Sequence, residues 1–263
     1  MKKETTTEEA IEALKPQEIV EPVDETKIEK VIEAVDSWKP ITELGRKVKT
    51  GEITDLNVIF DKGLQIKESQ IVDALMPNAE SDLLAIGQSK GKFGGGKRKA
   101  FRQTQKKTNE GNKPKFATYA VIGNKNGFVG LGYGKTKETV PAREKALRNA
   151  KVNVMRIRRG CGSWQCNCKT AHSIPYEVTG KTGSAVIILT PAPKGTGLKV
   201  EKECQKILAL AGIKDIYGKT FGQPGTKINL IKACEKALKN LTTTKVQAQF
   251  NGNLGITDGN KVQ

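Results

Sequence analysis

The apolar positions of the chain change their spacing near residue 116. From Trp38 to Gly87 they occur as scattered anchors, with a helix-like group at Ile71, Ala74 and Leu75. This pattern predicts a segment (residues 38–82) that wraps over the following domain. Residues 1–37 contain short helical patterns interrupted by prolines and have too little apolar surface to pack alone, so we expect a disordered extension.

Beyond residue 116 the spacing becomes that of β-strands. Phe116 to Ile122 and Phe128 to Tyr133 flank an Asn-Lys-Asn-Gly turn, which is a strong hairpin signal. A strand near Leu83 to Gln88 would complete a three-stranded antiparallel sheet. Alanines at i, i+4 spacing after Pro141 predict a helix that continues to about Arg158 and packs on the glycine-rich hairpin. We therefore expect an α+β domain over residues 83–160.

A second unit is expected over residues 173–241. It begins with an alternating strand at Ile174, Tyr176 and Val178, followed by a continuous apolar strand from Ala185 to Leu189. Helical spacing follows at about Val200 to Ala211 and Thr226 to Leu241, with a short strand, Ile213 to Tyr217, between them. The order predicts an α+β or α/β domain, and residues 242–263 are expected to form a flexible tail.

Charge narrows the choice of partner. The chain of 263 residues carries a net charge of +17. Its first 39 residues hold six lysines against eleven carboxylates, which leaves that segment at −5 and the rest of the chain at +22. An acidic extension on a basic body is typical of nucleic-acid-binding proteins. There is no apolar run long enough for a membrane span or a signal peptide, so we expect a cytosolic protein.

The densest charge lies between the first two expected strands. Residues 90–115 hold ten cations and one acid, Glu110, and their glycines let the backbone approach phosphates. We interpret this segment as a basic RNA-binding loop; a solvated flexible loop is the alternative. Its candidate contacts are Lys90, Lys92, Lys97, Arg98, Lys99, Arg102, Lys106, Lys107, Lys113 and Lys115.

A second basic group is expected at the helix of the first domain. Arg148, Lys151 and Arg158 fall within about one quarter of its circumference, and Arg156 and Arg159 extend the charge past its end. These side chains can reach phosphates together, although a solvated basic face is the alternative.

Residues 161–172 form a linker with a Cys/His cluster. Cys161, Cys166, Cys168 and His172 provide four ligands of the kind that zinc prefers, in the unusual spacing C-x4-C-x-C-x3-H. The spacing leaves two interpretations open: one Zn²⁺ ion, or reduced cysteines without metal. Cys204 and Cys234 lie on apolar helical faces and are expected to be buried structural cysteines.

Two segments resemble part of a phosphate-binding loop. Gly134-Lys135-Thr136 and Gly180-Lys181-Thr182 both lack the first glycine of that motif. A cysteine nucleophile with His172 as its base has no evident carboxylate to orient the imidazole. We therefore expect no catalysis. A metal-dependent nucleic-acid enzyme is the hypothesis that we rank below a structural RNA-binding protein and a free-standing RNA-binding regulator.

Three stretches of the body are the most specific: Val121 to Lys135, Pro141 to Lys151 and Pro191 to Leu198. Through them the body of the chain, from about Trp38 to Leu241, resembles the universal small-subunit ribosomal protein five family in its archaeal form. The Cys161 to Pro175 region resembles the archaeal branch. Lys135 and Lys194 lie within these stretches and join the RNA-binding candidates.

The resemblance implies a double-stranded-RNA-binding-like N-terminal domain and a C-terminal α/β domain with a left-handed β-α-β crossover. It also implies a structural role in the small ribosomal subunit near the decoding region and the channel through which mRNA enters, in support of subunit assembly and translational accuracy. The implied partners are small-subunit rRNA, mRNA and neighbouring ribosomal proteins of families four and eight. A free-standing RNA-binding translational regulator is the alternative.

Overall fold

The computed structural model describes residues 37–88 and 98–262. Three short helices come first: α3 (Glu43–Lys49), α4 (Leu56–Asp61) and α5 (Ser69–Leu75). Thr42 caps α3 by accepting a hydrogen bond from the Gly45 N–H, and Trp38 donates its indole N–H to Glu68 at 2.9 Å. The apolar side chains of these helices share a core with Ala146 and Ala150 on the first-domain helix, so the segment packs against that domain.

The first domain contains a five-stranded antiparallel sheet in place of the three strands expected. It consists of β1 (Glu80–Leu84), β2 (Arg102–Thr108), β3 (Gly111–Gly123), β4 (Phe128–Thr136) and β5 (Val154–Arg156). The central order is β1-β3-β4-β5, while β2 pairs with the outer half of β3. The hairpin between β3 and β4 forms as predicted, because the Asn124 side chain accepts hydrogen bonds from the backbone of Asn126 and Phe128.

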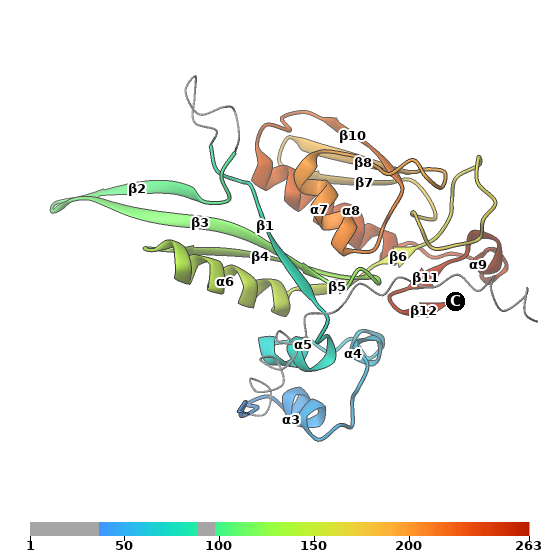
Figure 1. Ribbon diagram of the computed structural model, residues 1–263, viewed down its shortest axis with the longest axis horizontal. Coiled ribbons are helices and arrows are strands. Elements are labelled where there is room, and N and C mark those ends of the chain that lie inside the picture. The colour runs from blue at the N-terminus through green and yellow to red at the C-terminus, as the bar shows by residue number, and fades with distance from the viewer. Residues whose placement is uncertain (1–36, 89–97, 263) are drawn as a thin grey trace, which may run out of the picture.

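Helix α6 (Thr139–Val152) covers one face of this sheet (Figure 1). Gly130, Gly132 and Gly134 alternate along β4, and a Cβ atom at any of them would lie 2.2 Å from a backbone carbonyl oxygen of α6. The helix therefore lies closer to the strand than any side chain would permit.

The prediction that this helix continues to Arg158 was wrong. The helix ends at Val152, and the next residues form β5 beside β4. Asn153 donates its side-chain amide to the Leu131 carbonyl at 3.0 Å, which ties the end of the helix to β4. Val154 keeps an inward position, but as a strand residue.

The second domain is a four-stranded sheet covered by two helices. Its elements are β7 (Val178–Thr182), β8 (Ala185–Pro191), β9 (Leu198–Lys199), α7 (Lys202–Leu210), β10 (Ile216–Phe221) and α8 (Lys227–Thr243). The strand order is β7-β8-β10-β9, and β9 runs parallel to β10 with α7 between them, which makes a β-α-β unit. Cys204 and Cys234 are fully buried on these helices, as expected.

The two domains share one hydrophobic core. Leu84, Tyr119 and Val121 from the first sheet pack with Leu208 and other residues of α7 and α8. The β3–β4 turn also bonds to the end of α7, since the Lys125 N–H donates to the Leu210 carbonyl at 2.9 Å and the Gly127 N–H to that of Ala211 at 3.0 Å. No helix in the described ranges has the length and apolar character that crossing a membrane requires.

The expectation of a flexible C-terminal tail was also wrong for its described part. Residues 248–262 form α9 (Ala248–Leu254), β11 (Thr257–Asp258) and β12 (Lys261–Val262). Strand β11 pairs with β6 (Arg158–Arg159), and Ile256 is fully buried. The sequence misled because this segment has few apolar residues and depends on partners about 100 positions earlier in the chain. The acidic extension, residues 1–36, lies outside the described residues.

Candidate nucleic-acid interface and metal site

The segment expected to be a basic loop is largely a β-hairpin that extends from the body. Strand β2 and the first residues of β3 form this arm, residues 102–115, at one end of the molecule (Figure 1). The sequence hid the strands because their side chains are polar on both faces, so the alternation that marks a half-buried strand is absent. The prediction of a loop over the whole of residues 90–115 was therefore wrong.

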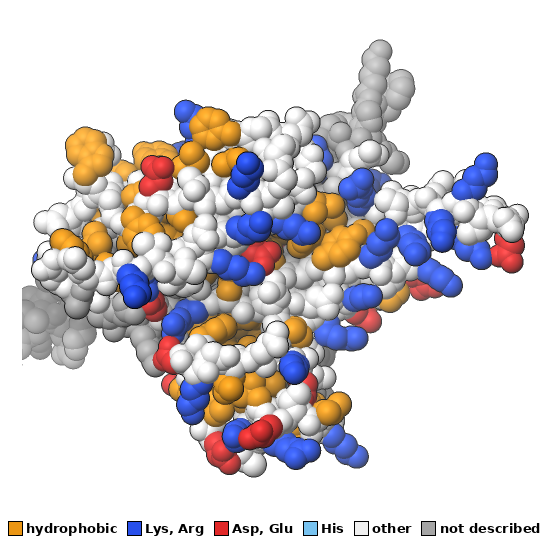
Figure 2. Space-filling view, turned by 180° about the vertical axis from the view of Figure 1, so that it is seen from behind, with side chains coloured by type: hydrophobic (Ala, Val, Ile, Leu, Met, Phe, Trp, Pro, Cys, Tyr) orange, Lys and Arg blue, Asp and Glu red, His pale blue; other side chains and the backbone are white. Residues whose placement is uncertain are grey.

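The arm presents cations on both faces. Lys106 lies directly opposite Lys113, and Arg102 and Lys115 share their face, whereas Lys107 lies on the other. All five side chains are exposed, and Figure 2 shows Lys and Arg side chains along the whole projection. Like charges directly opposite one another destabilise a strand pair, so a bound polyanion would stabilise this hairpin.

Negative charge on the arm is small. Glu110, at the hairpin tip, forms an exposed ion pair with Lys113 at 2.6 Å, and the sequence has no other acid between residues 98 and 137. The arm therefore keeps most of its positive charge for an external partner.

The other candidates from residues 90–115 lie near the base of the arm or outside the described residues. Arg98 donates to the Gly225 carbonyl at 3.3 Å, and Lys99 is exposed beside the arm. Lys90, Lys92 and Lys97 fall in the part of the chain that the structure does not describe.

Three further residues predicted to bind RNA are exposed on different parts of the body. Lys135, at the end of β4, lies on the same sheet face as Arg102, with Ala117 between them. Arg148 is exposed on α6, and Lys194 is exposed after β8. Only Lys135 therefore extends the face of the arm that carries Arg102.

Four of the predicted basic residues make contacts within the protein instead. Lys151 pairs with Asp73 at 2.6 Å, and Arg156 pairs with Asp61. Arg158 lies in β6 rather than on the helix and forms a two-point ion pair with Asp258, at 2.8 and 2.9 Å. The hydrogen bonds from Arg158 to Asp258 raise the pKa of Arg158.

Arg159 is the fourth of these residues and is buried. It donates to the Asn126 side chain at 2.7 Å and to the Gly259 carbonyl at 3.1 Å, and burial lowers the pKa of its guanidinium group. Lys151, Arg156, Arg158 and Arg159 therefore support the fold, and the helix-face cluster predicted from the sequence does not form. The acids involved lie far away in the sequence, where no local pattern marks them.

The Cys/His cluster, in contrast, assembles. The ligand atoms of Cys161, Cys166, Cys168 and His172 all lie within 4.8 Å of one another. Sulfur atoms around a tetrahedral zinc ion lie roughly 3.8 Å apart, given Zn–S distances of about 2.3 Å. The four side chains therefore fit a four-coordinate metal with small adjustments. The loop is closed at its base, where the backbones of Gly160 and Ser173 bond to each other in both directions at 2.9 Å.

The cysteines of the cluster differ in acidity. Burial raises the pKa of Cys161 to about 11. Burial acts in the same direction on Cys168, but its hydrogen bonds with Thr170, Cys166 and Cys161 together outweigh burial and lower the pKa of Cys168 to about 6. Cys168 is therefore converted to the thiolate that binds metals more easily than Cys161.

Asp215 is the residue of this site that the sequence did not reveal. Its Oδ2 lies 2.8 Å from His172 Nδ1, and both side chains are buried. This contact leaves His172 Nε2, 3.8 Å from Cys166 Sγ, facing the cluster. A carboxylate that holds the outer nitrogen of a histidine is a common feature of zinc sites. The same carboxylate accepts the N–H groups of Gly195 and Gly197, which links the cluster to the loop before β9.

The two partial phosphate-loop motifs lie in regular strands. Gly134 to Thr136 ends β4, and Gly180 to Thr182 belongs to β7. Neither is a loop that leads into a helix, which phosphate binding of that type requires.

The fold and the exposed charge are those of a two-domain α+β protein in which a basic arm, suited to a polyanion such as RNA, projects from the body. Residues 100–158 match the family model described as ribosomal protein S5, N-terminal domain, and residues 180–250 match ribosomal protein S5, C-terminal domain. The chain belongs to the ribosomal protein S5 family.

Relatives in archaea cover most of the chain. The small ribosomal subunit protein uS5 of Nanoarchaeum equitans is 45% identical over 225 residues, which is 86% of this chain and 96% of the relative. The protein of the same name from Methanocaldococcus jannaschii is 43% identical over 225 residues, 86% of this chain and 97% of that protein. The protein of the same name from Staphylothermus marinus is 44% identical over 208 residues, which is 79% of this chain and 90% of that protein.

Proposed function

We propose that this protein is a structural constituent of the small ribosomal subunit that binds small-subunit rRNA through the β2–β3 arm. The observation that carries the proposal is the exposed charge of the arm, five cations with one weakly competing acid. The relatives named above, which are small-subunit proteins, support the same assignment. The role requires no chemistry from the chain.

The position in the subunit is a finer part of the proposal. We propose a position near the decoding region and the channel through which mRNA enters, beside ribosomal proteins of families four and eight, as the resemblance implies. Arg98, Lys99, Lys135, Arg148 and Lys194 are exposed and join the arm as proposed rRNA contacts. Co-sedimentation with salt-washed small subunits distinguishes a constituent of the subunit from a free-standing regulator, because a regulator would remain mainly in the soluble fraction.

Salt dependence tests the arm directly. We expect Lys106→Ala and Lys107→Ala together to weaken binding to a folded rRNA fragment and to lower the log–log salt slope by about 0.7 to 0.9 for each phosphate that the variant no longer neutralises. Fluorescence anisotropy over a range of KCl concentrations gives this slope. Lys62→Ala/Lys67→Ala is a charge-matched control at exposed positions of the helical segment, and it should leave the slope unchanged. Equal slopes for the arm variant and the wild-type protein would contradict the role of the arm.

We also propose that Cys161, Cys166, Cys168 and His172 bind one Zn²⁺ ion, with Asp215 as the carboxylate that orients His172. When bound, the ion would cross-link a loop that has little apolar content of its own. Thus the site would be structural and would use all four ligand positions.

Metal analysis tests the zinc proposal. The purified protein should contain about one zinc per chain, and Cys166→Ser/Cys168→Ser should contain none. Asp215→Asn should keep the ligands but lower zinc affinity about 10- to 100-fold, measured by competition with a chromogenic chelator. Cys204→Ser, at a buried cysteine outside the cluster, should retain the metal. A wild-type protein without stoichiometric metal would exclude the proposal.

A further inference from the structure

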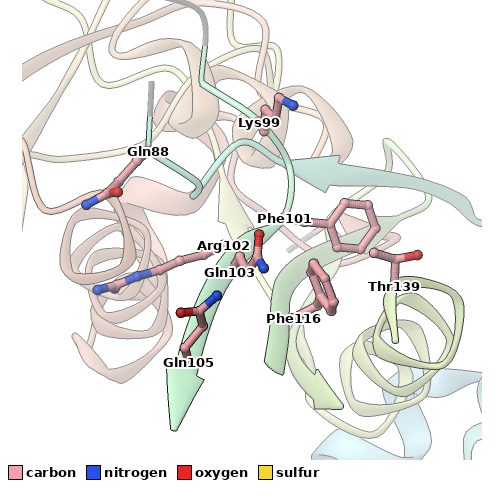
Figure 3. A pocket seen from close by; sticks show the side chains of 8 residues that line it. All are labelled: Gln88, Lys99, Phe101, Arg102, Gln103, Gln105, Phe116 and Thr139. Carbon is pink, nitrogen blue, oxygen red and sulfur yellow. The ribbon is translucent and has the colours of Figure 1, made fainter. Parts of the chain in front are cut away.

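A hollow of about 650 Å³ lies at the base of the arm (Figure 3). Gln103 and Phe116 are opposite one another in the β2–β3 register and share one face of the arm, and Phe101 comes just before β2. Thr139, the first residue of α6, closes this side. The volume lies within the range of sites that enclose a small organic molecule.

The aromatic side chains of the hollow are not needed by the core. Phe101 and Phe116 are both only half-buried, and neither belongs to the two hydrophobic cores. Figure 3 shows the two rings on neighbouring parts of the wall. Half-exposed rings beside a basic arm are the features on which an unpaired base can stack.

The polar lining supplies the remaining recognition chemistry. Gln88, Gln103 and Gln105 each carry an amide donor and an amide acceptor, and within residues 37–88 and 98–262 their side chains form no hydrogen bond. Such groups match the mixed donor and acceptor edges of nucleobases. The charged residues of the lining, Lys99 and Arg102, are both cations, which suits an anionic group such as a phosphate rather than a basic or neutral one.

We infer that this hollow binds one unpaired RNA nucleotide. Its base stacks on Phe101 or Phe116, the glutamine amides contact the base edge, and Lys99 contacts an adjoining phosphate. The inference rests on the proposed RNA-binding function and adds a preference to it: paired RNA follows the arm, whereas a bulged or looped-out nucleotide enters the hollow.

Two RNA hairpins test the inference, one fully paired and one identical except for a single unpaired adenosine. The full-length protein should bind the bulged hairpin more tightly. Phe101→Leu/Phe116→Leu should weaken binding of the bulged hairpin about 5- to 150-fold, the factor that corresponds to about 1 to 3 kcal/mol of stacking, and leave the paired hairpin unchanged. Phe221→Leu, at an exposed ring on β10 outside the hollow, is the control and should change neither affinity.

Further variants distinguish failure of the proposed RNA-binding function from failure of the hollow as a nucleotide site. Lys106→Ala/Lys107→Ala should weaken both hairpins equally, because it removes arm charge alone. If the wild-type protein binds neither hairpin, the proposed function fails as well. If it binds both equally and the phenylalanine variant does the same, the hollow does not select an unpaired base. Should that variant unfold, Gln103→Leu at an exposed position makes the same comparison, and unchanged discrimination would overturn the inference.

Discussion

At the scale of single residues, the alternating glycines of β4 set the distance between sheet and helix. Gly132 is the most enclosed of them, because its missing Cβ would meet the Ala146 carbonyl oxygen at 2.2 Å and the Ala150 nitrogen at 2.2 Å. These contacts are to backbone, which cannot rotate away as a side chain can. The close approach therefore depends on glycine for space rather than for an unusual backbone angle.

Gly132→Ala should destabilise the protein by about 1 to 3 kcal/mol or more, since an added methyl group forces α6 away from β4. Urea unfolding followed by circular dichroism measures this loss. The control is Gly252→Ala in α9, where a Cβ would meet no atom within 4 Å. It should be neutral or stabilise the protein by up to about 1 kcal/mol. Similar effects of the two substitutions would show that packing against α6 is not the constraint.

At the scale of elements, strand β11 near the C-terminus pairs with β6 and buries the residues around it. Asp258 neutralises Arg158, whose side chain is only 11% exposed, and Ile256 fills a fully buried position. Without this strand, Arg158 would remain in a poorly solvated place without its carboxylate partner. The C-terminal residues are therefore part of the folded body.

Deleting residues 256–263 should destabilise the protein by about 3 to 5 kcal/mol or prevent folding, because a partly buried ion pair loses one partner. Thermal unfolding compares this form with one that lacks only residues 261–263 and keeps Asp258 and Ile256. The shorter deletion should have a much smaller effect. Equal melting temperatures for the two truncated forms would argue against a role for the Arg158–Asp258 pair.

At the scale of the whole molecule, the two domains share apolar core and backbone bonds. The C-terminal end of α7 lies against the β3–β4 turn so closely that a Cβ at Gly123 would come within 2.4 Å of the Leu210 carbonyl oxygen. Separating the domains would expose Leu84, Val121 and Leu208 together. The body that carries the arm and the Cys/His cluster is therefore expected to be rigid.

We predict that the protein unfolds in a single cooperative transition. Burial shared between the domains makes either one unstable without the other. Differential scanning calorimetry should give one peak with equal calorimetric and van't Hoff enthalpies. Two resolved transitions would contradict the prediction, and a fragment of residues 173–241 that folds alone would do the same.

The sequence determined the features that depend on neighbouring residues. The hairpin turn at Asn124 to Gly127, the two helices of the second domain and the four residues of the Cys/His cluster were identified, because turn chemistry, helical spacing and ligand spacing are local. The family could also be identified, since its most specific stretches lie in these same elements.

Only the tertiary structure decided how distant residues are used. It turned the expected basic loop into a paired arm, because an exposed strand that is polar on both faces leaves no hydrophobic pattern. It assigned Lys151, Arg156 and Arg158 to internal acids and brought Asp215 to His172 across 43 residues. A charged side chain in the sequence shows no preference between an internal carboxylate and an external phosphate. Burial and the position of the nearest opposite charge make that choice, and both exist only in the folded chain.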